Sequence, residues 1–142
     1  MAVRNFPWQW NNCDYKTFIL LGEGMSEFKV TIRSRDNNIQ VLELKGYLDA
    51  HTTPVLEDSF QKMLNEKQYR LIVNCKELSY ISSAGLGVFM AFIEDVRANA
   101  GDIKLSDMSP KVFNIFDLLG FPMLYDIVKS EEEAANKFEV KQ

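Results

Sequence analysis

Residues 80–90 read YISSAGLGVFM, and this stretch joins a strand-like run to a helical one. The run before it, RLIVNC at 70–75, is short and continuously apolar, which predicts a strand covered on both faces. From Ser83 onward the apolar residues follow the spacing of a helix that buries one face. These predicted core residues are Leu86, Phe89, Met90, Ile93 and Val96. The fold is expected to be organised around this strand-to-helix connection.

Two adjacent serines, Ser82 and Ser83, stand at the connection, and Ala84, Gly85 and Gly87 follow them. A serine at a helix N-terminus is ordinarily a cap, whose oxygen accepts a backbone N–H and stabilises the helix by about 1 kcal/mol. One serine suffices for a cap, and each glycine in a helix costs about 1 kcal/mol relative to alanine. The glycines therefore indicate either close packing of the helix on the sheet or a surface left bare for another molecule.

A phosphate group fits this position chemically. A helix N-terminus attracts anions through its free N–H groups and its dipole. A phosphorylated Ser83 would gain about −1.5 to −2 charges at pH 7. The fold would survive while the surface changed, which is what a reversible binding switch requires.

Three other chemistries fit these residues less well. A hydrolase nucleophile elbow needs glycine where Ile81 stands, and His51 is the only histidine that could serve as a base. No phosphate-binding Gly-x-x-x-x-Gly-Lys-Ser/Thr loop is present. The sequence therefore predicts a protein that is not an enzyme.

Two strands and a helix are predicted before residue 70. EFKVTIRS at 27–34 alternates between apolar and polar residues, and IQVLELKG at 39–46 is apolar on both parities. The polar RDNN turn between them favours a hairpin. Thr53 is expected to cap the following helix, with Pro54 at its first position. The predicted apolar face of this helix comprises Leu56, Phe60, Met63 and Leu64.

The C-terminal part continues the alternation of strands and helices. After Gly101, taken as a helix stop, DIKLSD at 102–107 is expected to form a strand, and LYDIV at 124–128 a short edge strand. Ser109 and Ser130 are expected to cap the third and fourth helices. The stripe of the third helix comprises Val112, Ile115, Phe116 and Leu119, and Gly120 closes it. This order predicts an α/β fold with a mixed β-sheet, a leading hairpin and about four helices packed on it.

Composition excludes several classes of function. The chain has 142 residues, which suits one domain, and its net charge of −4 with no basic stripe argues against nucleic-acid binding. Cys13 and Cys75 make no disulfide framework, and Cys75 is expected to be a buried thiol. With His51 the single histidine, we expect no metal site and no cofactor. No apolar run reaches membrane-spanning length and no signal pattern opens the chain, so we expect no membrane association and a cytoplasmic location.

Residues 1–24 differ from the rest and form an N-terminal extension with two alternative interpretations. Thr17–Leu21 reads as one short extra strand. Alternatively, the segment is a leader that the natural protein lacks, because Met25 follows Gly-Glu-Gly, whose codons are purine-rich like a bacterial ribosome-binding site. Both interpretations remain open, and the domain proper is expected to cover residues 25–142.

The serine motif and its surroundings resemble a known family, the STAS domain of bacterial anti-sigma factor antagonists. The resemblance rests on YISSAGLGVFMAFIEDVRANAGDIKL preceded by RLIVNCKEL, on LKGYLDAHTTPVLEDSF upstream, and on VFNIFDLLGFPMLYDIVKSEEEA downstream. The match runs in order from about Glu27 to Phe138, and the Ser-x-Gly-Leu-Gly signature followed by this helix is fairly specific to the family. Residues 1–24 have no counterpart in the core family.

The resemblance implies a partner-switching protein. Such an antagonist binds a GHKL-type serine kinase that doubles as an anti-sigma factor, and thereby frees the other client of the kinase. Phosphorylation of one serine at the start of the second helix breaks that complex, and a PP2C-type phosphatase reverses the modification. A second implied possibility is a STAS scaffold subunit of a sensory or transport assembly that never cycles through phosphate.

The resemblance also assigns residues. Matched through Gly85-Leu86-Gly87, the phosphoacceptor falls on Ser83, with Ser82 as the alternative acceptor. Ser82 occupies a place that is often Asp in the family, and Ala84 a place that is often Ser or Thr. The implied partner-binding residues are Asp49, Ser82, Ala84, Gly85, Leu86 and Gly87. For Asp49, a carboxylate that stabilises its own turn is an equally good interpretation.

Overall fold

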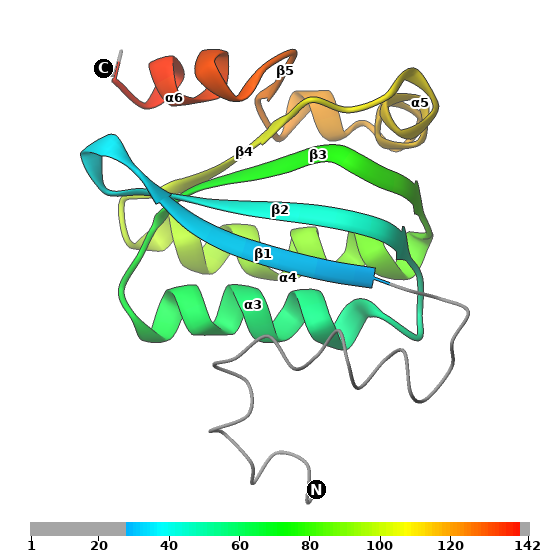
Figure 1. The fold of residues 1–142 in the computed structure, drawn as a ribbon, viewed down its shortest axis with the longest axis horizontal. Coiled ribbons are helices and arrows are strands. Elements are labelled where there is room, and N and C mark those ends of the chain that lie inside the picture. The colour runs from blue at the N-terminus through cyan, green and yellow to red at the C-terminus, as the bar shows by residue number, and fades with distance from the viewer. Residues whose placement is uncertain (1–27, 140–142) are drawn as a thin grey trace, which may run out of the picture.

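The computed structural model describes residues 28–139, which form one sheet with helices packed against it (Figure 1). Its strands are β1 (Phe28–Arg35), β2 (Ile39–Leu48), β3 (Arg70–Ile81), β4 (Asp102–Ser106) and β5 (Ile127–Val128). Its α-helices are α3 (Thr53–Asn65), α4 (Ser83–Ala98), α5 (Pro110–Leu118) and α6 (Glu131–Glu139), and its 3-10 helices are η2 (Asp36–Asn38) and η3 (Phe121–Met123). The predicted α/β architecture is confirmed. The predictions for residues 1–24, and for Cys13 and Met25, lie outside the described residues.

The strands lie in the order β1-β2-β3-β4-β5, which is also their order in the chain. β1 and β2 form the predicted antiparallel hairpin, joined by η2, where Asn37 and Asn38 have φ angles of 66° and 62°. Asparagine adopts this left-handed conformation more readily than most residues. The other neighbouring strands pair in parallel, so β2, β3 and β4 all end at the same edge of the sheet. The loops that leave these three ends are therefore neighbours.

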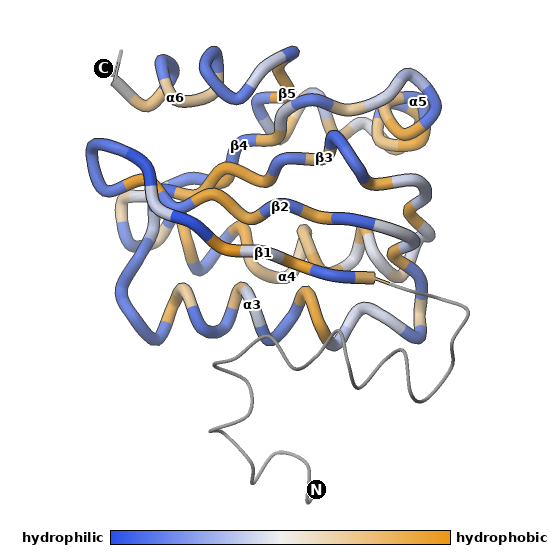
Figure 2. The backbone as a smooth tube through the Cα atoms, viewed as in Figure 1, coloured by the Kyte–Doolittle hydropathy of each residue, from blue (hydrophilic) through white to orange (hydrophobic). Residues whose placement is uncertain are grey.

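Hydrophobic side chains gather in two clusters, one on each face of the sheet. The backbone tube in Figure 2 marks hydrophobic residues as orange segments of the strands and helices. On one face α3 and α4 pack on the strands, and α5 joins this cluster through Phe116, whose ring centroid lies 5.9 Å from that of Phe89. On the other face α6 contributes Ala134, Ala135 and Phe138 over Ile39, Val41 and Ile72. Strand β3 is thus covered on both sides at residues 71–73, as its continuous apolar run predicts. Cys75 is fully buried, as expected.

Strand β3 is longer than the predicted run of 70–75 and continues to Ile81. Its second half pairs with the end of β2, where the register shifts twice, between Glu43 and Lys45 and between Gly46 and Tyr47. The pairing ends at Leu48 and Ile81, and the Ser82 N–H donates to the Leu48 carbonyl over 2.9 Å. This bond holds the start of α4 beside the loop that follows β2.

Capping residues in the sequence predict the first residue of each of these helices to within about one position. Ser109 and Ser130 cap α5 and α6 as predicted, because their hydroxyls accept the N–H groups of Val112 and Glu133 at 3.2 and 3.1 Å. The prediction for α3 is wrong by one residue: Thr52 precedes the helix, and its side chain forms no cap bond. The Thr52 hydroxyl instead donates to the Tyr47 carbonyl over 2.9 Å.

Two apolar residues predicted to be buried are exposed. Met90 is 49% exposed on the outer surface of α4, although Phe89 and Ile93 beside it are buried. Leu119 is 59% exposed, because it follows the last residue of α5. Helical periodicity thus overestimated the width of the buried face in α4 and the length of α5.

Gly101 ends α4 for a reason other than the predicted one. The left-handed residue at this helix end is Ala100, with φ 65°. A Cβ atom at Gly101 would lie 2.0 Å from the Tyr69 carbonyl oxygen. Gly101 is therefore required by the close approach of the chain entering β3.

Candidate functional site

The two serines at the start of α4 have different roles in the structure. Ser82 is the N-cap residue, and its hydroxyl accepts the Gly85 N–H over 3.3 Å. Ser83 is the first residue of the helix and is exposed. Its hydroxyl forms no hydrogen bond with any other residue in the range 28–139. The cap is thus complete without Ser83, whose oxygen remains open to solvent.

The helix residues that follow Ser83 carry little charge. The first turn of α4 contains no acidic residue, and no Lys or Arg occurs between Ser83 and Val96. Residues one and two turns along the same side are Gly87 and Met90, both exposed.

The two glycines after the serines differ in what surrounds them. A Cβ atom at Gly85 would lie 2.8 Å from Leu48 Cγ and 2.9 Å from Ile81 Cγ1, so this glycine lets the helix pack closely on the strand ends. A Cβ atom at Gly87 would meet nothing within 4 Å. Close packing thus explains Gly85, while Gly87 leaves an open surface.

Other predicted partner-binding residues are also divided between surface and interior. Ala84 is exposed beside Ser83, whereas Leu86 is only 3% exposed and belongs to the core. The Leu86 side chain is therefore unavailable to a partner in this structure and anchors the helix instead. At the start of α4 the exposed residues are Ser83, Ala84 and Gly87, while Ser82 is half-buried.

Asp49 lies in the loop after β2, next to the start of α4, and stabilises its own turn. Its Oδ1 atom accepts the backbone N–H groups of His51 and Thr52 at 2.9 and 3.2 Å. Its other carboxylate oxygen forms no hydrogen bond within residues 28–139. The stabilisation of its own turn therefore uses one carboxylate oxygen of Asp49, and the second oxygen could still accept a hydrogen bond from another molecule.

Sequence reasoning missed two exposed tyrosines at the same edge. Tyr47 and Tyr80 are paired across β2 and β3 and are 54% and 38% exposed. Each directly precedes a buried residue, Leu48 or Ile81, and side chains alternate along a strand. That alternation was a usable signal, since it places both tyrosines on the face opposite α3 and α4.

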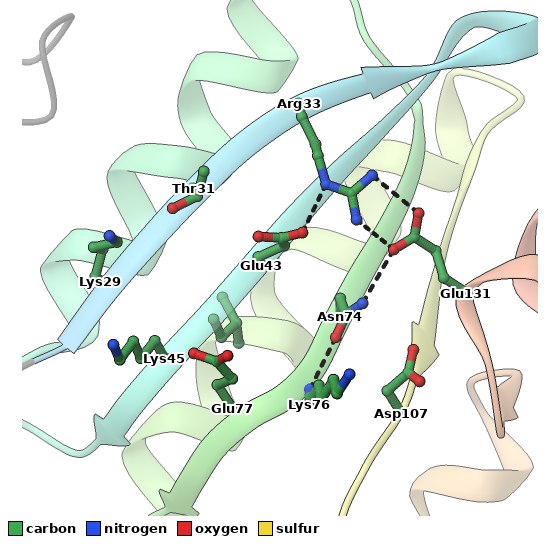
Figure 3. Close-up of a pocket in the computed structure, with 11 residues that line it drawn as sticks. Lys29, Thr31, Arg33, Glu43, Lys45, Asn74, Lys76, Glu77, Asp107 and Glu131 are labelled. Carbon is green, nitrogen blue, oxygen red and sulfur yellow. Dashed lines mark hydrogen bonds and ion pairs between the residues drawn. The ribbon is translucent and has the colours of Figure 1, made fainter.

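A polar groove of about 520 Å³ opens on this same face, further from the strand ends (Figure 3). At one end Arg33 binds Glu43 at 2.6 Å and Glu131 at 2.5 and 3.1 Å, while Asn74 donates to Glu131 over 3.1 Å. Burial raises the pKa of Glu131, but hydrogen bonds from Arg33, Arg35 and Asn74 outweigh it and lower the pKa from 4.5 to about 2. None of the predicted site residues lines the groove, whose ion pairs fix α6 to the hairpin.

The described residues offer no support for two other classes of site. Among residues 28–139 no three His, Cys, Asp or Glu side chains converge in a way that could hold a metal ion. In the same range no helix has the length and apolar character needed to cross a bilayer.

Known proteins share this fold and this sequence pattern. The model of the STAS domain family matches residues 30–134. The anti-sigma-B factor antagonist of Bacillus subtilis (strain 168) is 32% identical over 103 residues, which cover 72% of this chain and 93% of that protein. A putative anti-sigma factor antagonist of Bordetella bronchiseptica is 28% identical over 95 residues, covering 67% and 82%.

A solved structure agrees in fold. The anti-sigma factor antagonist SpoIIAA in its unphosphorylated form superposes with a TM-score of 0.68 at 23% identity, covering 80% of this chain and 98% of that one. At this level of identity the likeness concerns the fold, whereas the family model and the Bacillus relative concern the sequence. The chain belongs to the STAS domain family, among the bacterial anti-sigma factor antagonists.

Proposed function

We propose that this chain is the phosphorylatable antagonist of a partner-switching pathway and that Ser83 is its phosphoacceptor. Unphosphorylated, it binds a GHKL-type serine kinase that doubles as an anti-sigma factor, and so releases the other client of the kinase. Phosphorylation of Ser83 breaks the complex, and a PP2C-type phosphatase restores the binding form. The protein acts in the cytoplasm by binding alone, with no catalysis and no cofactor of its own.

The observation that carries this proposal is the division of roles between the two serines. Ser82 supplies the cap of α4, so the Ser83 hydroxyl can be modified without removing a bond that the fold uses. Ser83 is exposed and next to the bare backbone at Gly87, which leaves room for a kinase active site to approach. Ser82 is less suited as acceptor, because its oxygen is already bonded to the Gly85 N–H.

Charge explains why phosphate would release the kinase. An interface over Ser83 would also cover Ala84, Gly87 and Met90, none of which is charged. Residues 83–96 supply no Lys or Arg to pair with a phosphate. A phosphate enclosed there would lose its hydration without an ion-pair partner from this helix, which favours dissociation.

Binding measurements test the proposal. The probes are the purified GHKL-type serine kinases of the source organism, titrated with the wild-type chain, Ser83→Ala and Ser83→Asp. We expect one kinase to bind wild type and Ser83→Ala equally and Ser83→Asp at least about 100-fold more weakly, since a buried unpaired charge costs several kcal/mol. Ser34→Asp is the matched control, because it adds the same charge to an exposed serine in the β1–β2 hairpin.

Two results would contradict the proposal. Equal affinity for wild type and Ser83→Asp would remove the switch. Absence of binding to every kinase, together with a native pull-down that recovers transport subunits, would favour the scaffold alternative.

A further inference from the structure

Large apolar side chains that are exposed fall into two groups in the described part of the chain. Three belong to α5, η3 and their junction, whereas the other three are a methionine on α4 and two tyrosines near the ends of β2 and β3, on the sheet face opposite α4. The first group comprises Leu118, Leu119 and Met123, and the second Tyr47, Tyr80 and Met90. Single exposed apolar residues are normal on soluble domains, whereas adjoining ones mark binding sites more often, and Tyr47 and Tyr80 adjoin. The tyrosines of the second group are not explained by the phosphoacceptor.

Tyr47 and Tyr80 form an ordered pair. They face each other in the register of β2 and β3, with ring centroids 6.0 Å apart and an angle of 39° between the rings. Their backbones are the last positions before the buried Leu48 and Ile81. Rings held by a sheet lose little conformational freedom on binding, which makes such tyrosines effective anchors.

The pair lies within reach of any partner centred on Ser83. Successive Cα atoms are about 3.8 Å apart, so the Tyr80 Cα is at most about 11 Å from that of Ser83. An interface of ordinary size covers about 800 Å² of each partner, which corresponds to a disc about 16 Å in radius. A kinase that covers Ser83 and extends over the open face of the sheet therefore reaches both rings.

The loop next to Ser83 also fixes Tyr47. The Thr52 hydroxyl donates to the Tyr47 carbonyl over 2.9 Å and accepts the Asp49 N–H at the same distance. The Asp49 carboxylate in turn accepts the Thr52 N–H. Asp49 thus holds, through Thr52, the backbone that carries the ring.

We infer that Tyr47 and Tyr80 form an aromatic anchor for the kinase that phosphorylates Ser83, an inference that rests on the proposed function. The occupant is the kinase because the pair is continuous with the acceptor through the Ser82–Leu48 backbone bond and the Asp49 loop. Tyrosine is among the residues that contribute most to binding when a partner covers them. The tyrosine pair thereby adds binding contacts for the kinase close to the Ser83 hydroxyl.

The test uses the full chain, with Tyr47→Ala/Tyr80→Ala as the variant and Leu118→Ala/Met123→Ala as the matched control. For the kinase that phosphorylates wild type, we expect the double tyrosine variant to raise Kd and KM by at least about 30-fold with kcat unchanged. The control is expected to stay within twofold of wild type. Both variants remove exposed side chains, and circular dichroism with urea unfolding checks that the fold is retained.

Different results separate this inference from the proposed function. Wild-type phosphorylation at Ser83 with an unchanged Kd for the tyrosine variant overturns the anchor alone. No phosphorylation of wild type by any kinase overturns the proposed function and the anchor with it. Sedimentation showing a wild-type dimer that the tyrosine variant abolishes, with kinase affinity unchanged, assigns the pair to a second copy of the chain and also overturns the anchor.

Discussion

Helices α4 and α6 both begin with a serine cap after a strand, but their first turns differ in charge. In α6, Ser130 is followed by Glu131, Glu132 and Glu133, so built-in carboxylates occupy the positive end of the helix. Glu131 is held by two arginines and Asn74. In α4, Ser82 is followed by an unbonded hydroxyl, an alanine and glycines, with no acid in the first turn.

The ion pairs at the start of α6 are a permanent contact, whereas the contact proposed at the start of α4 depends on whether Ser83 carries a phosphate. The negative charge at α6 is always present and fixes the helix across the sheet through partners up to 98 residues away. The first turn of α4 contains no acidic residue, so we expect the fold to tolerate an added phosphate there. In the proposed function the α4 terminus changes state without unfolding, while the α6 terminus stabilises the structure around it.

The largest expected effect concerns the permanent contact. Glu131→Ala removes the acceptor of Arg33, Arg35 and Asn74, and we expect the free energy of unfolding to fall by about 2–3 kcal/mol at pH 7. The folded pKa of about 2 lies below the ordinary 4.5, so this stability is present above pH 4.5 and is lost as pH falls toward 2.

Urea unfolding of wild type and Glu131→Ala between pH 7 and pH 3 measures that loss. The difference between the two proteins is expected to shrink as the pH falls. Glu132→Ala is the control, since its side chain is 77% exposed and its change is expected within about 0.5 kcal/mol. A pH-independent difference would contradict the electrostatic origin of the contact.

The two glycines of α4 give the next effect, with opposite signs. Gly85→Ala places a Cβ against Leu48 and Ile81 and is expected to destabilise the protein by about 1–3 kcal/mol. Gly87→Ala meets no neighbour and is expected to stabilise it by up to about 1 kcal/mol. Urea midpoints measure both changes, and equal effects at the two positions would refute the separation of packed from open surface.

The two serines are expected to differ by a smaller amount. Ser82→Ala removes the cap bond to the Gly85 N–H and should cost about 1 kcal/mol. Ser83→Ala removes a hydroxyl without a partner and should change stability by less than about 0.5 kcal/mol. Thermal unfolding distinguishes the variants, and a larger loss for Ser83→Ala would show that the fold depends on this hydroxyl.

The smallest expected effect concerns added charge at α4. Ser83→Asp places a carboxylate at the helix N-terminus, and we expect a stabilisation of about 0.3–1 kcal/mol at low salt that fades as salt rises. Unfolding at two ionic strengths measures it. Destabilisation at low salt would mean that this terminus does not tolerate a negative charge.

Local signals predicted much of the fold. The caps at Ser109 and Ser130 and the hairpin turn depend on neighbouring residues, and the structure has them where the sequence indicates. Such local signals do not predict contacts between segments that are distant in the sequence. The need for Gly101 comes from the Tyr69 carbonyl, and Met90 is exposed because no element within residues 28–139 covers that side of α4.

The candidate site, too, was predicted only in part from the sequence. The motif located the serines, but only the hydrogen bond from Gly85 shows which of them caps α4. The pairing of Tyr47 with Tyr80 depends on a β2–β3 register with two irregularities, which sequence periodicity does not reveal.

Intact-mass measurement of phosphate incorporation tests the central claim most directly. Wild type, Ser82→Ala and Ser83→Ala are each incubated with ATP and the kinase that binds wild type. We expect one phosphate on wild type and on Ser82→Ala, and none on Ser83→Ala. A phosphate retained by Ser83→Ala, or lost from a folded Ser82→Ala, would contradict it.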